Sequence, residues 1–266
     1  MKKLMFAAAA IAAGVAMADI TSANVVGYQG IEVKNGFNMI ALNFQPVDGT
    51  EEIAISDLVG DKSMLVAGNG AASSDQIQVW DGEKFTAYFY RAKKTTNPKF
   101  TAGPAWVNAN SSGTVTKDKI KRGAGVWFAR PATAPEKATL TLSGSVSAET
   151  YTHAINPGFN MISSAFPVDM ALNNGPIDWV KCGAVAGNGA ASSDQIQVWD
   201  GEKFTAYFYR AKKTTNPKFT AGPAWVNANS SGTVTTDVIP AGKGFWYARP
   251  DGKDAGTLEQ VSPIAK

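Results

Sequence analysis

A perfect internal duplication limits the possible folds of this chain more than any other feature of its sequence. Residues 66–116 recur without a change at 185–235, so the repeated block is 51 residues long and the spacing is 119 residues. Solenoid and propeller repeats have periods of roughly 20 to 50 residues, so this longer spacing predicts two tandem folded units. The sharp edges of the identity indicate that one copy recently overwrote the other. The sequence identity between the two copies is therefore a poor guide to which residues are functional.

The duplication continues, less perfectly, on both sides of the block. Upstream, Gly-Phe-Asn-Met-Ile at 36–40 matches the same five residues at 158–162. Downstream, Gly-x-Gly-x-Trp at 123–127 matches 242–246. Whole units were therefore copied. The predicted division is a signal peptide at 1–18, copy 1 at 19–131, a linker at 132–137, copy 2 at 138–250, and a linker with a final strand at 251–266.

The N-terminus has the pattern of a secretory signal peptide. Lys2 and Lys3 precede an apolar run at 4–13, and Ala-Met-Ala at 16–18 precedes Asp19. No cysteine directly follows this cleavage site, and no later apolar run is long enough to cross a ~30 Å hydrocarbon core. We expect an exported protein without a transmembrane segment in the mature chain. It would lie outside the cell or at the cell surface, with the periplasm as the alternative.

The charge balance argues against nucleic acid as a partner. The chain has 25 basic and 22 acidic residues, and two of the basic residues lie in the expected signal peptide. The mature chain is then nearly neutral, without the basic character of nucleic-acid-binding domains. Cys182 is the single cysteine. We interpret it as a small buried side chain, with an intermolecular disulfide as the alternative.

Short apolar runs separated by turn residues predict an all-β fold. Runs and turns recur at intervals of about ten residues, which favours a β-sandwich or a small β-barrel in each copy. The Asn35-Gly36 and Pro157-Gly158 pairs predict a hairpin between the first two strands of each copy. The sole helix expected in copy 1 runs from Thr50 to about Leu58, because Thr50 is a suitable N-cap and acidic residues follow it.

The centre of the repeat, at 77–90, predicts a further hairpin. A three-residue loop at 80–82, with Gly82 in the left-handed region, places Ile77 opposite Phe85. Side chains alternate between the two faces of a strand, so this register assigns every residue to a face. The predicted core face carries Ile77, Val79, Phe85, Ala87 and Phe89, and the other face carries Gln78, Lys84, Thr86, Tyr88 and Tyr90.

An aromatic group on the second face of this hairpin is the candidate binding surface. Flat aromatic rings next to hydrogen-bond donors can stack on sugars or anchor a protein partner. The alternative is that a second sheet or the other copy covers this face, since large aromatic side chains are mostly buried. The candidate residues in both copies are Trp80, Tyr88, Tyr90, Arg91, Trp199, Tyr207, Tyr209 and Arg210, with nearby lysines that include Lys93, Lys94 and Lys99.

The sequence offers few residues for catalysis or metal binding. The sole histidine, His153, aligns with Ile31 of copy 1, which indicates a structural, partly buried position. Five pairs of acids are repeated, but all lie beside turn residues, where they are expected to cap turns. The glycines of the loop at 68–70 and of 123–125 lack the third glycine and the helix of a phosphate-binding loop. We predict no catalytic residues, no metal site and no cofactor.

Four short motifs recur or stand out along the chain. They are Ala-Asn-Val-Val-Gly-Tyr at 23–28, Gly-Phe-Asn-Met-Ile, Ile-Gln-Val-Trp-Asp-Gly, and a closing Gly-x-Gly-x-aromatic-aromatic strand. Together they resemble a family of uncharacterised bacterial exported β-repeat proteins. The resemblance covers most of the mature chain. It implies export and a β-rich repeat, and supplies no ligand or catalytic residues.

These observations lead to three ranked hypotheses about function. The first is a noncatalytic exported protein with a structural, adhesive or assembly role at the cell surface, whose partner is a second copy of itself. The second is a tandem carbohydrate-binding protein that uses the aromatic sheet face to hold a surface polysaccharide, with avidity from two linked sites. The third is an enzyme that acts through loop carboxylates.

Overall fold

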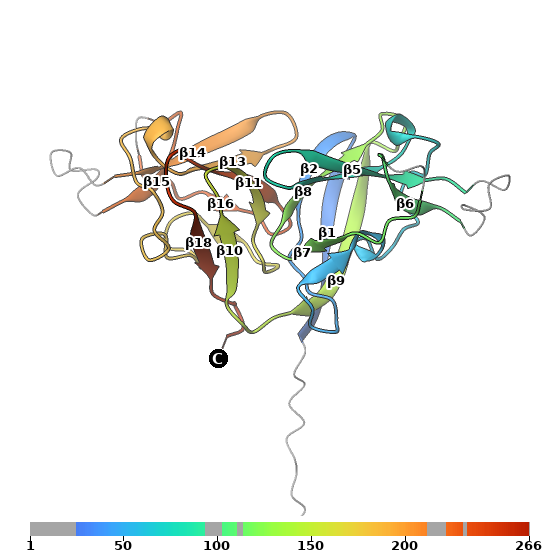
Figure 1. Cartoon of the computed structure of the whole chain (residues 1–266), viewed down its shortest axis with the longest axis horizontal. Coiled ribbons are helices and arrows are strands. Elements are labelled where there is room, and N and C mark those ends of the chain that lie inside the picture. The colour runs from blue at the N-terminus through green and yellow to red at the C-terminus, as the bar shows by residue number, and fades with distance from the viewer. Residues whose placement is uncertain (1–24, 94–102, 111–113, 212–221, 231–232, 266) are drawn as a thin grey trace, which may run out of the picture.

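The computed structural model describes residues 25–93, 103–110, 114–211, 222–230 and 233–265, and within them the chain is all-β (Figure 1). The predicted all-β class is confirmed. No helix in these ranges is long and apolar enough to cross a membrane. The strands of copy 1 are β1 (Val25–Lys34), β2 (Gly36–Ala41), β3 (Glu52–Ala54), β4 (Gln76–Trp80), β5 (Phe85–Arg91), β6 (Ala105–Asn108), β7 (Lys119–Lys121), β8 (Gly125–Arg130) and β9 (Lys137–Val146).

Copy 2 repeats this order strand by strand. Single turns of 3-10 helix, η1 (Ile55–Asp57), η2 (Ala71–Ser73) and η4 (Ala190–Ser192), lie in the connections. The strands of copy 2 are β10 (Tyr151–Ile155), β11 (Gly158–Ser163), β12 (Met170–Ala171), β13 (Gln195–Trp199), β14 (Phe204–Arg210), β15 (Ala224–Asn227), β16 (Val238–Ile239), β17 (Gly244–Arg249) and β18 (Gly256–Gln260).

Each copy builds a five-stranded antiparallel sheet, ordered β2-β8-β4-β5-β6 in copy 1 and β11-β17-β13-β14-β15 in copy 2. Two-stranded ribbons, β1–β9 and β3–β7 or β10–β18 and β12–β16, accompany each sheet. The apolar side chains of the ribbons and of one sheet face form a core. One such core lies within residues 31–142 and a second within 155–258.

The boundary between the copies lies later than predicted. β9 pairs with β1 along ten residues, from Val25 opposite Val146 to Lys34 opposite Lys137. β18 pairs with β10 in the same way. The segment at 132–137 therefore joins two strands of copy 1 and does not separate the copies. The connection between them is 147–150, and the Pro- and Ala-rich composition at 132–137 belongs to a loop within copy 1.

The predicted hairpins at Asn35-Gly36 and Pro157-Gly158 are wrong. β1 pairs with β9 and β2 pairs with β8, so the chain turns a corner at Gly36 and enters a different sheet. Gly36 has φ +87°. Asn38 holds the corner, because its side chain accepts a bond from the Lys34 amide at 2.9 Å and donates one to the Lys34 carbonyl at 2.7 Å. In copy 2, the Asn160 side chain makes the same two hydrogen bonds with the backbone amide and carbonyl of Asn156.

The helix expected at 50–58 is also absent from the described structure. The segment forms the short strand β3, which pairs with β7, and then the single 3-10 turn η1. Asp48 holds the preceding turn by accepting bonds from the Thr50 amide and hydroxyl. Ile53 pairs with Ile120, and Ile55 is buried. Packing of these side chains against the core overrides the helix-start signal at Thr50.

The hairpin β4–β5 forms in a different register from the predicted one. Trp80 is opposite Phe85, and Ile77 is opposite Tyr88. The loop has four residues because Asp81 accepts bonds from the Glu83 and Lys84 amides. Gly82 has positive φ, +108°, as predicted. The longer loop changes the face assignment: Ile77, Val79, Tyr88 and Tyr90 belong to the core, and Trp80, Phe85 and Phe89 lie on the outer face.

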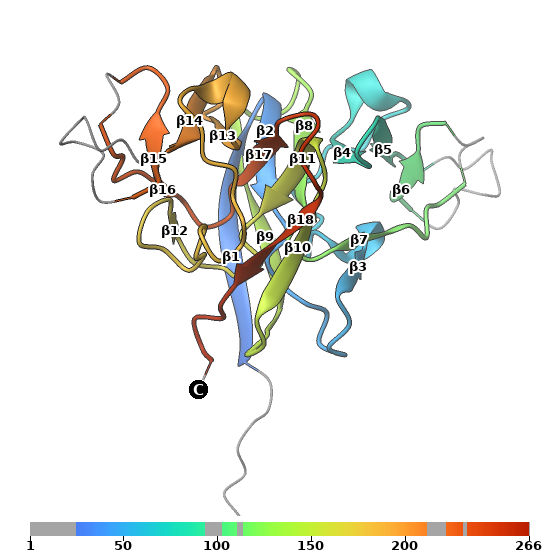
Figure 2. The ribbon, with the colours of Figure 1, turned by 60° about the vertical axis from the view of Figure 1, so that its left-hand side comes forward.

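The two five-stranded sheets meet where β2 and β8 contact β11 and β17 (Figures 1 and 2). The Ala41 amide donates to the Gly242 carbonyl at 2.9 Å, and the Ser163 amide donates to the Gly123 carbonyl at 2.7 Å. Ala41 and Ser163 hold equivalent places in the two copies, as do Gly242 and Gly123. The junction therefore has approximate twofold symmetry.

The second glycine of each Gly-x-Gly segment lies where β8 and β17 cross. A Cβ on Gly125 would lie 2.7 Å from the Ile162 carbonyl oxygen. A Cβ on Gly244 would lie 2.8 Å from the Ile40 carbonyl oxygen and 3.1 Å from the Gly125 Cα. Glycine is the residue that permits such a close approach of backbones. The two Gly-x-Gly segments therefore allow strands of copy 1 and copy 2 to pack directly against each other.

Replacement of Gly125 by Ala should destabilise the protein, because the new methyl group overlaps a carbonyl that belongs to the other copy. We expect a loss of about 1–3 kcal/mol in the free energy of unfolding, as for other overpacked sites, measured by urea denaturation. Gly70→Ala is the control, because Gly70 is extended, with φ −169°, and no atom lies within 4 Å of its added Cβ. Equal effects of the two substitutions would contradict the close crossing.

Candidate functional site

Two groups of aromatic side chains flank the junction, each built by both copies. The first, the Trp80 cluster, consists of Trp80 and Phe85 from copy 1 with Phe159 and Trp246 from copy 2. The ring centroids of Trp80 and Trp246 are 5.5 Å apart with an edge-to-face geometry, and those of Phe159 and Trp246 are 5.7 Å apart. The Trp80 indole N–H donates to the Phe159 carbonyl at 2.9 Å. This hydrogen bond ties the hairpin of copy 1 to β11 of copy 2.

The second group, the Trp199 cluster, is the symmetric equivalent of the first. It consists of Trp199 and Phe204 from copy 2 with Phe37 and Trp127 from copy 1. Trp127 and Trp199 are 5.8 Å apart between centroids, again edge to face. The Trp199 indole N–H donates to the Phe37 carbonyl at 2.9 Å. Both clusters thus have the same composition, hydrogen bond and ring geometry.

The hairpin loop explains why the clusters form at this place. The four-residue loop leaves Trp80 and Phe85 directly opposite each other at the end of the hairpin, 4.9 Å apart between ring centroids. Both side chains therefore lie on the outer sheet face, which is turned toward the other copy. Trp127 lies on the same face of β8, since its neighbours Val126 and Phe128 are in the core.

The four Phe side chains in these clusters remain accessible to solvent. Phe85 is 38% exposed and Phe204 39%, while Phe37 is 50% and Phe159 51% exposed. The four Trp side chains are half-buried beneath them. Each cluster therefore leaves part of its apolar surface exposed, which makes it a candidate site of contact with another molecule.

The structure does not bring the residues of the predicted binding surface together on one face. Trp80 and Trp199 lie in the clusters, but the four tyrosines are buried in the cores. The Tyr88 hydroxyl donates to Asp118 and that of Tyr207 to Asp237, each at 2.8 Å. Burial, together with these carboxylates, raises the pKa of Tyr88 and Tyr207. The error follows from the hairpin register, which reversed the two faces.

The two arginines of the predicted surface lie away from the tryptophans. The Arg91 guanidinium lies 6.0 Å from the Phe89 ring centroid, and Arg210 has the same relation to Phe208. Lys93 is exposed, and Lys94 and Lys99 lie outside the described residues. Sequence reasoning missed Phe37, Phe85, Trp127 and their equivalents Phe159, Phe204 and Trp246. Their recurrence in both copies was the available signal.

Most of the repeated acids have identifiable structural partners. Asp75 and Asp194 are buried beside Arg130 and Arg249, at 3.5 Å and 3.0 Å respectively. Burial raises the pKa of Asp75. Asp81 and Asp200 cap the hairpin loops, and Asp118 and Asp237 accept the tyrosine hydroxyls. Over the described ranges, no three His, Cys, Asp or Glu side chains are grouped so that they could hold a metal ion.

One polar group breaks the symmetry of the junction. The buried Arg122 guanidinium binds Glu51 of copy 1 through two hydrogen bonds, of 2.8 and 2.9 Å. It also donates to the Ala165 carbonyl of copy 2 at 3.2 Å, and its Cζ lies 4.6 Å from the Tyr151 ring centroid. Burial alone would raise the Glu51 pKa, but Arg122 lowers it below its ordinary value. The equivalent of Arg122 in copy 2 is Ala241.

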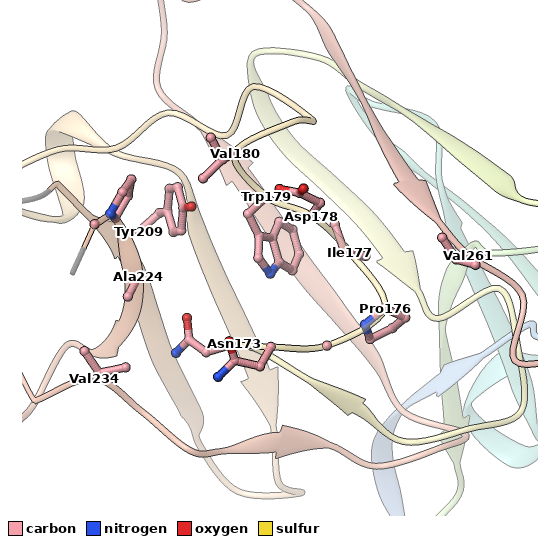
Figure 3. Close-up of a pocket in the computed structure, with 14 residues that line it drawn as sticks. Asn173, Pro176, Ile177, Asp178, Trp179, Val180, Tyr209, Ala224, Val234 and Val261 are labelled. Carbon is pink, nitrogen blue, oxygen red and sulfur yellow. The ribbon is translucent and has the colours of Figure 1, made fainter.

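A cavity of about 730 Å³ lies in copy 2 between the 173–180 segment and the edge of the sheet. Figure 3 shows the Tyr209 ring on one side of this cavity and Trp179 and Asp178 on the other. Burial, with the nearby negative charge of Asp178, raises the pKa of Tyr209 to about 12. In copy 1 the equivalent segment, between Asp48 and Val66, is two residues longer than the one between Asp169 and Val185, and it places Ile55, Leu58 and Val59 in the core. This cavity is the second candidate site.

Comparison with known proteins gives no match: no family model, curated protein or solved structure is similar to this chain at a significant level.

Acid should destabilise the junction through His153, which is buried as its alignment with Ile31 predicted. Burial, and then the Arg122 charge, lowers the His153 pKa to about 4. The unfolded chain therefore binds a proton near pH 6.5, which the folded chain does not bind until about pH 4. We expect up to about 3 kcal/mol of stability to be lost over this range.

The measurement is urea unfolding at a series of pH values between 7 and 4, for the natural chain and for His153→Ile. Isoleucine is the residue that copy 1 places at the equivalent position. The stability difference between the two proteins should change with pH in this window, because the carboxylates contribute equally to both. A difference that stays constant with pH would show that His153 is not held neutral.

Proposed function

We propose that this chain is a noncatalytic exported protein with a structural, adhesive or assembly role at the cell surface. The observation that carries the proposal is the pair of matched aromatic clusters, held by both copies and left partly exposed. The signal-peptide pattern at residues 1–18 supports the export of the protein. A protein that presents two equivalent apolar contacts on one body is suited to bind two partners, or two sites on one partner.

The noncatalytic character is supported by the roles of the repeated polar residues. The buried acids neutralise Arg130 and Arg249, and the exposed acids hold loops. His153 is buried against Arg122 and Tyr151, away from solvent. Among the residues that the structure describes, no carboxylate forms a hydrogen bond or ion pair with it. General acid–base chemistry requires a group that reaches the substrate at a suitable pKa. The aromatic residues are therefore better candidates for function than the acids.

Removal of the exposed phenylalanines should weaken association with the partner. We expect Phe85→Ser with Phe204→Ser to raise the concentration needed for self-association by at least about tenfold, because roughly 1.4 kcal/mol of apolar contact would be lost. Light scattering over a wide concentration range, with a reducing agent for Cys182, measures this. Binding to cell-surface preparations tests the adhesive role in the same variant.

The control for this experiment is Tyr28→Ser, which removes an aromatic residue that is 82% exposed but lies outside both clusters. The stability of the double variant is measured alongside by urea unfolding, because Phe85 and Phe204 also pack against Trp246 and Trp127 of the other copy, and association is compared under conditions in which both proteins are fully folded. Unchanged self-association and unchanged surface binding in the double variant would refute a role for the clusters.

A second candidate function is carbohydrate binding, favoured by the cavity beside Tyr209. Its lining combines aromatic and aliphatic walls with a hydroxyl, a carboxylate and the Asn174 amide. Ligand cavities of 300–1,000 Å³ with a few converging polar groups are typical of small-molecule sites. The polar groups can pair with sugar hydroxyls, and the apolar walls can contact the sugar ring.

Tyr209→Phe tests this second function, because it removes the hydroxyl and keeps the buried ring. In a polysaccharide screen, we expect affinity for any bound glycan to fall by about tenfold, the effect of one lost hydrogen bond. Tyr90→Phe is the matched control, since Tyr90 is the equivalent residue of copy 1, where the adjoining segment is filled by core side chains. Equal effects of the two variants would exclude the Tyr209 cavity as the site.

A further inference from the structure

The strand amides, indole N–H groups and aromatic rings at the junction make their contacts twice, through equivalent residues of the two copies. Each copy donates one strand amide and one indole N–H to the other, and each contributes half of both aromatic clusters. An interface with this property is isologous, so the surface of each copy is complementary to its own equivalent. The shared residues, in equivalent pairs, are Phe37 and Phe159, Trp80 and Trp199, Phe85 and Phe204, Gly125 and Gly244, and Trp127 and Trp246.

Neither copy depends on a strand from the other for its sheets. Among the described residues, the strands that form β-ladders with one another lie within 25–146 or within 151–260. The cores are likewise separate, one within 31–142 and one within 155–258. The covalent connection is the four-residue segment 147–150. Opening of the junction would therefore leave the sheets and cores of both copies intact.

We propose that the junction forms between molecules as well as within one molecule, so that copy 1 of one molecule of this chain pairs with copy 2 of another. This inference rests on the assembly role proposed above and names its partner. In a closed dimer, each copy 1 would pair with copy 2 of the other molecule. Both junctions of this dimer would make the same contacts as the junction of the monomer. The balance between the two forms is then set by the connection at 147–150 and by protein concentration.

Arg122 determines which copies pair. In the native junction it lies against Tyr151 and Phe166 of copy 2 and donates to the Ala165 carbonyl. In a pair of two copies 1, the equivalent of Tyr151 is Gln29, which has no ring. In a pair of two copies 2, Ala241 would stand where Arg122 stands. Pairing of unlike copies is therefore favoured, and exchange yields closed dimers or longer chains.

Disulfide trapping between two different full-length chains tests this proposal. Ile40 of copy 1 and Lys243 of copy 2 are antiparallel strand partners across the junction, at a separation that suits a disulfide. One chain carries Ile40→Cys and the other Lys243→Cys, both with Cys182→Ser. A disulfide between them requires copy 1 of one molecule to meet copy 2 of the other. The two chains are mixed at high concentration, oxidised mildly and analysed on a nonreducing gel.

We expect at least tenfold more covalent dimer from this mixture than from a control mixture of Lys62→Cys and Lys243→Cys, since Lys62 is exposed and is not paired with Lys243. Deletion of Ala148 and Glu149 shortens the connection and should raise the yield at least threefold. The mirror pair, Ala124→Cys with Ile162→Cys, gives an independent version of the test if Ile40→Cys does not fold.

A chain that carries both Ile40→Cys and Lys243→Cys establishes that the geometry permits the bond. If this chain forms its internal disulfide while the mixed chains give no more dimer than the control, even with the shortened connection, exchange between molecules is overturned. That result leaves the assembly role itself standing, because two closed molecules can still associate through the exposed parts of the aromatic clusters, and light scattering detects such association without exchange.

Discussion

The passage of β8 across β17 at Gly125 and Gly244 is the contact on which the rest of the molecule depends. The two backbones lie too close for any Cβ to fit between them. This approach brings the ends of β2 and β11 within hydrogen-bonding distance of the opposite copy. It also places Trp127 and Trp246 against the hairpin end of the other copy. A wider separation would divide both aromatic clusters, because each takes half of its rings from each side.

The two faces of each five-stranded sheet have different roles, and the hairpin loop sets which residues serve each role. Inward-facing residues such as Ile77 and Tyr88 complete the core with the ribbons. Outward-facing Trp80 and Phe85 meet the other copy. Asp81 supports this division, because it accepts two hydrogen bonds from amides of the four-residue loop. A register shift of one residue moves the side chains of a strand to the opposite face, so the loop length determines both the core and the interface.

The sequence predicted the strand content, the repeat and the positive φ of Gly82, because these depend on local patterns. It did not predict the pairing of β1 with β9, which joins residues more than a hundred positions apart. It also assigned Tyr88 and Tyr90 to the surface, since the apolar pattern favoured a three-residue loop where the structure has a four-residue loop. The sequence analysis included Trp80 in the candidate surface but not Trp127. Each of these residues contacts a tryptophan of the opposite copy, and these contacts depend on how the two copies pack. A single-copy pattern carries no trace of that packing.

The asymmetric group around Arg122 shows how duplication can preserve a contact while restricting it. The twofold-related contacts are apolar rings, glycines and backbone hydrogen bonds. The Arg122–Glu51 pair adds little net stability, since burying the guanidinium costs about as much as its attraction to the partly exposed Glu51 carboxylate returns. Its value lies in orientation: the guanidinium fits against Tyr151 and Phe166, and copy 1 has no tyrosine at the equivalent of Tyr151. Symmetric contacts thus hold the two copies together, and one buried charge determines which copy faces which.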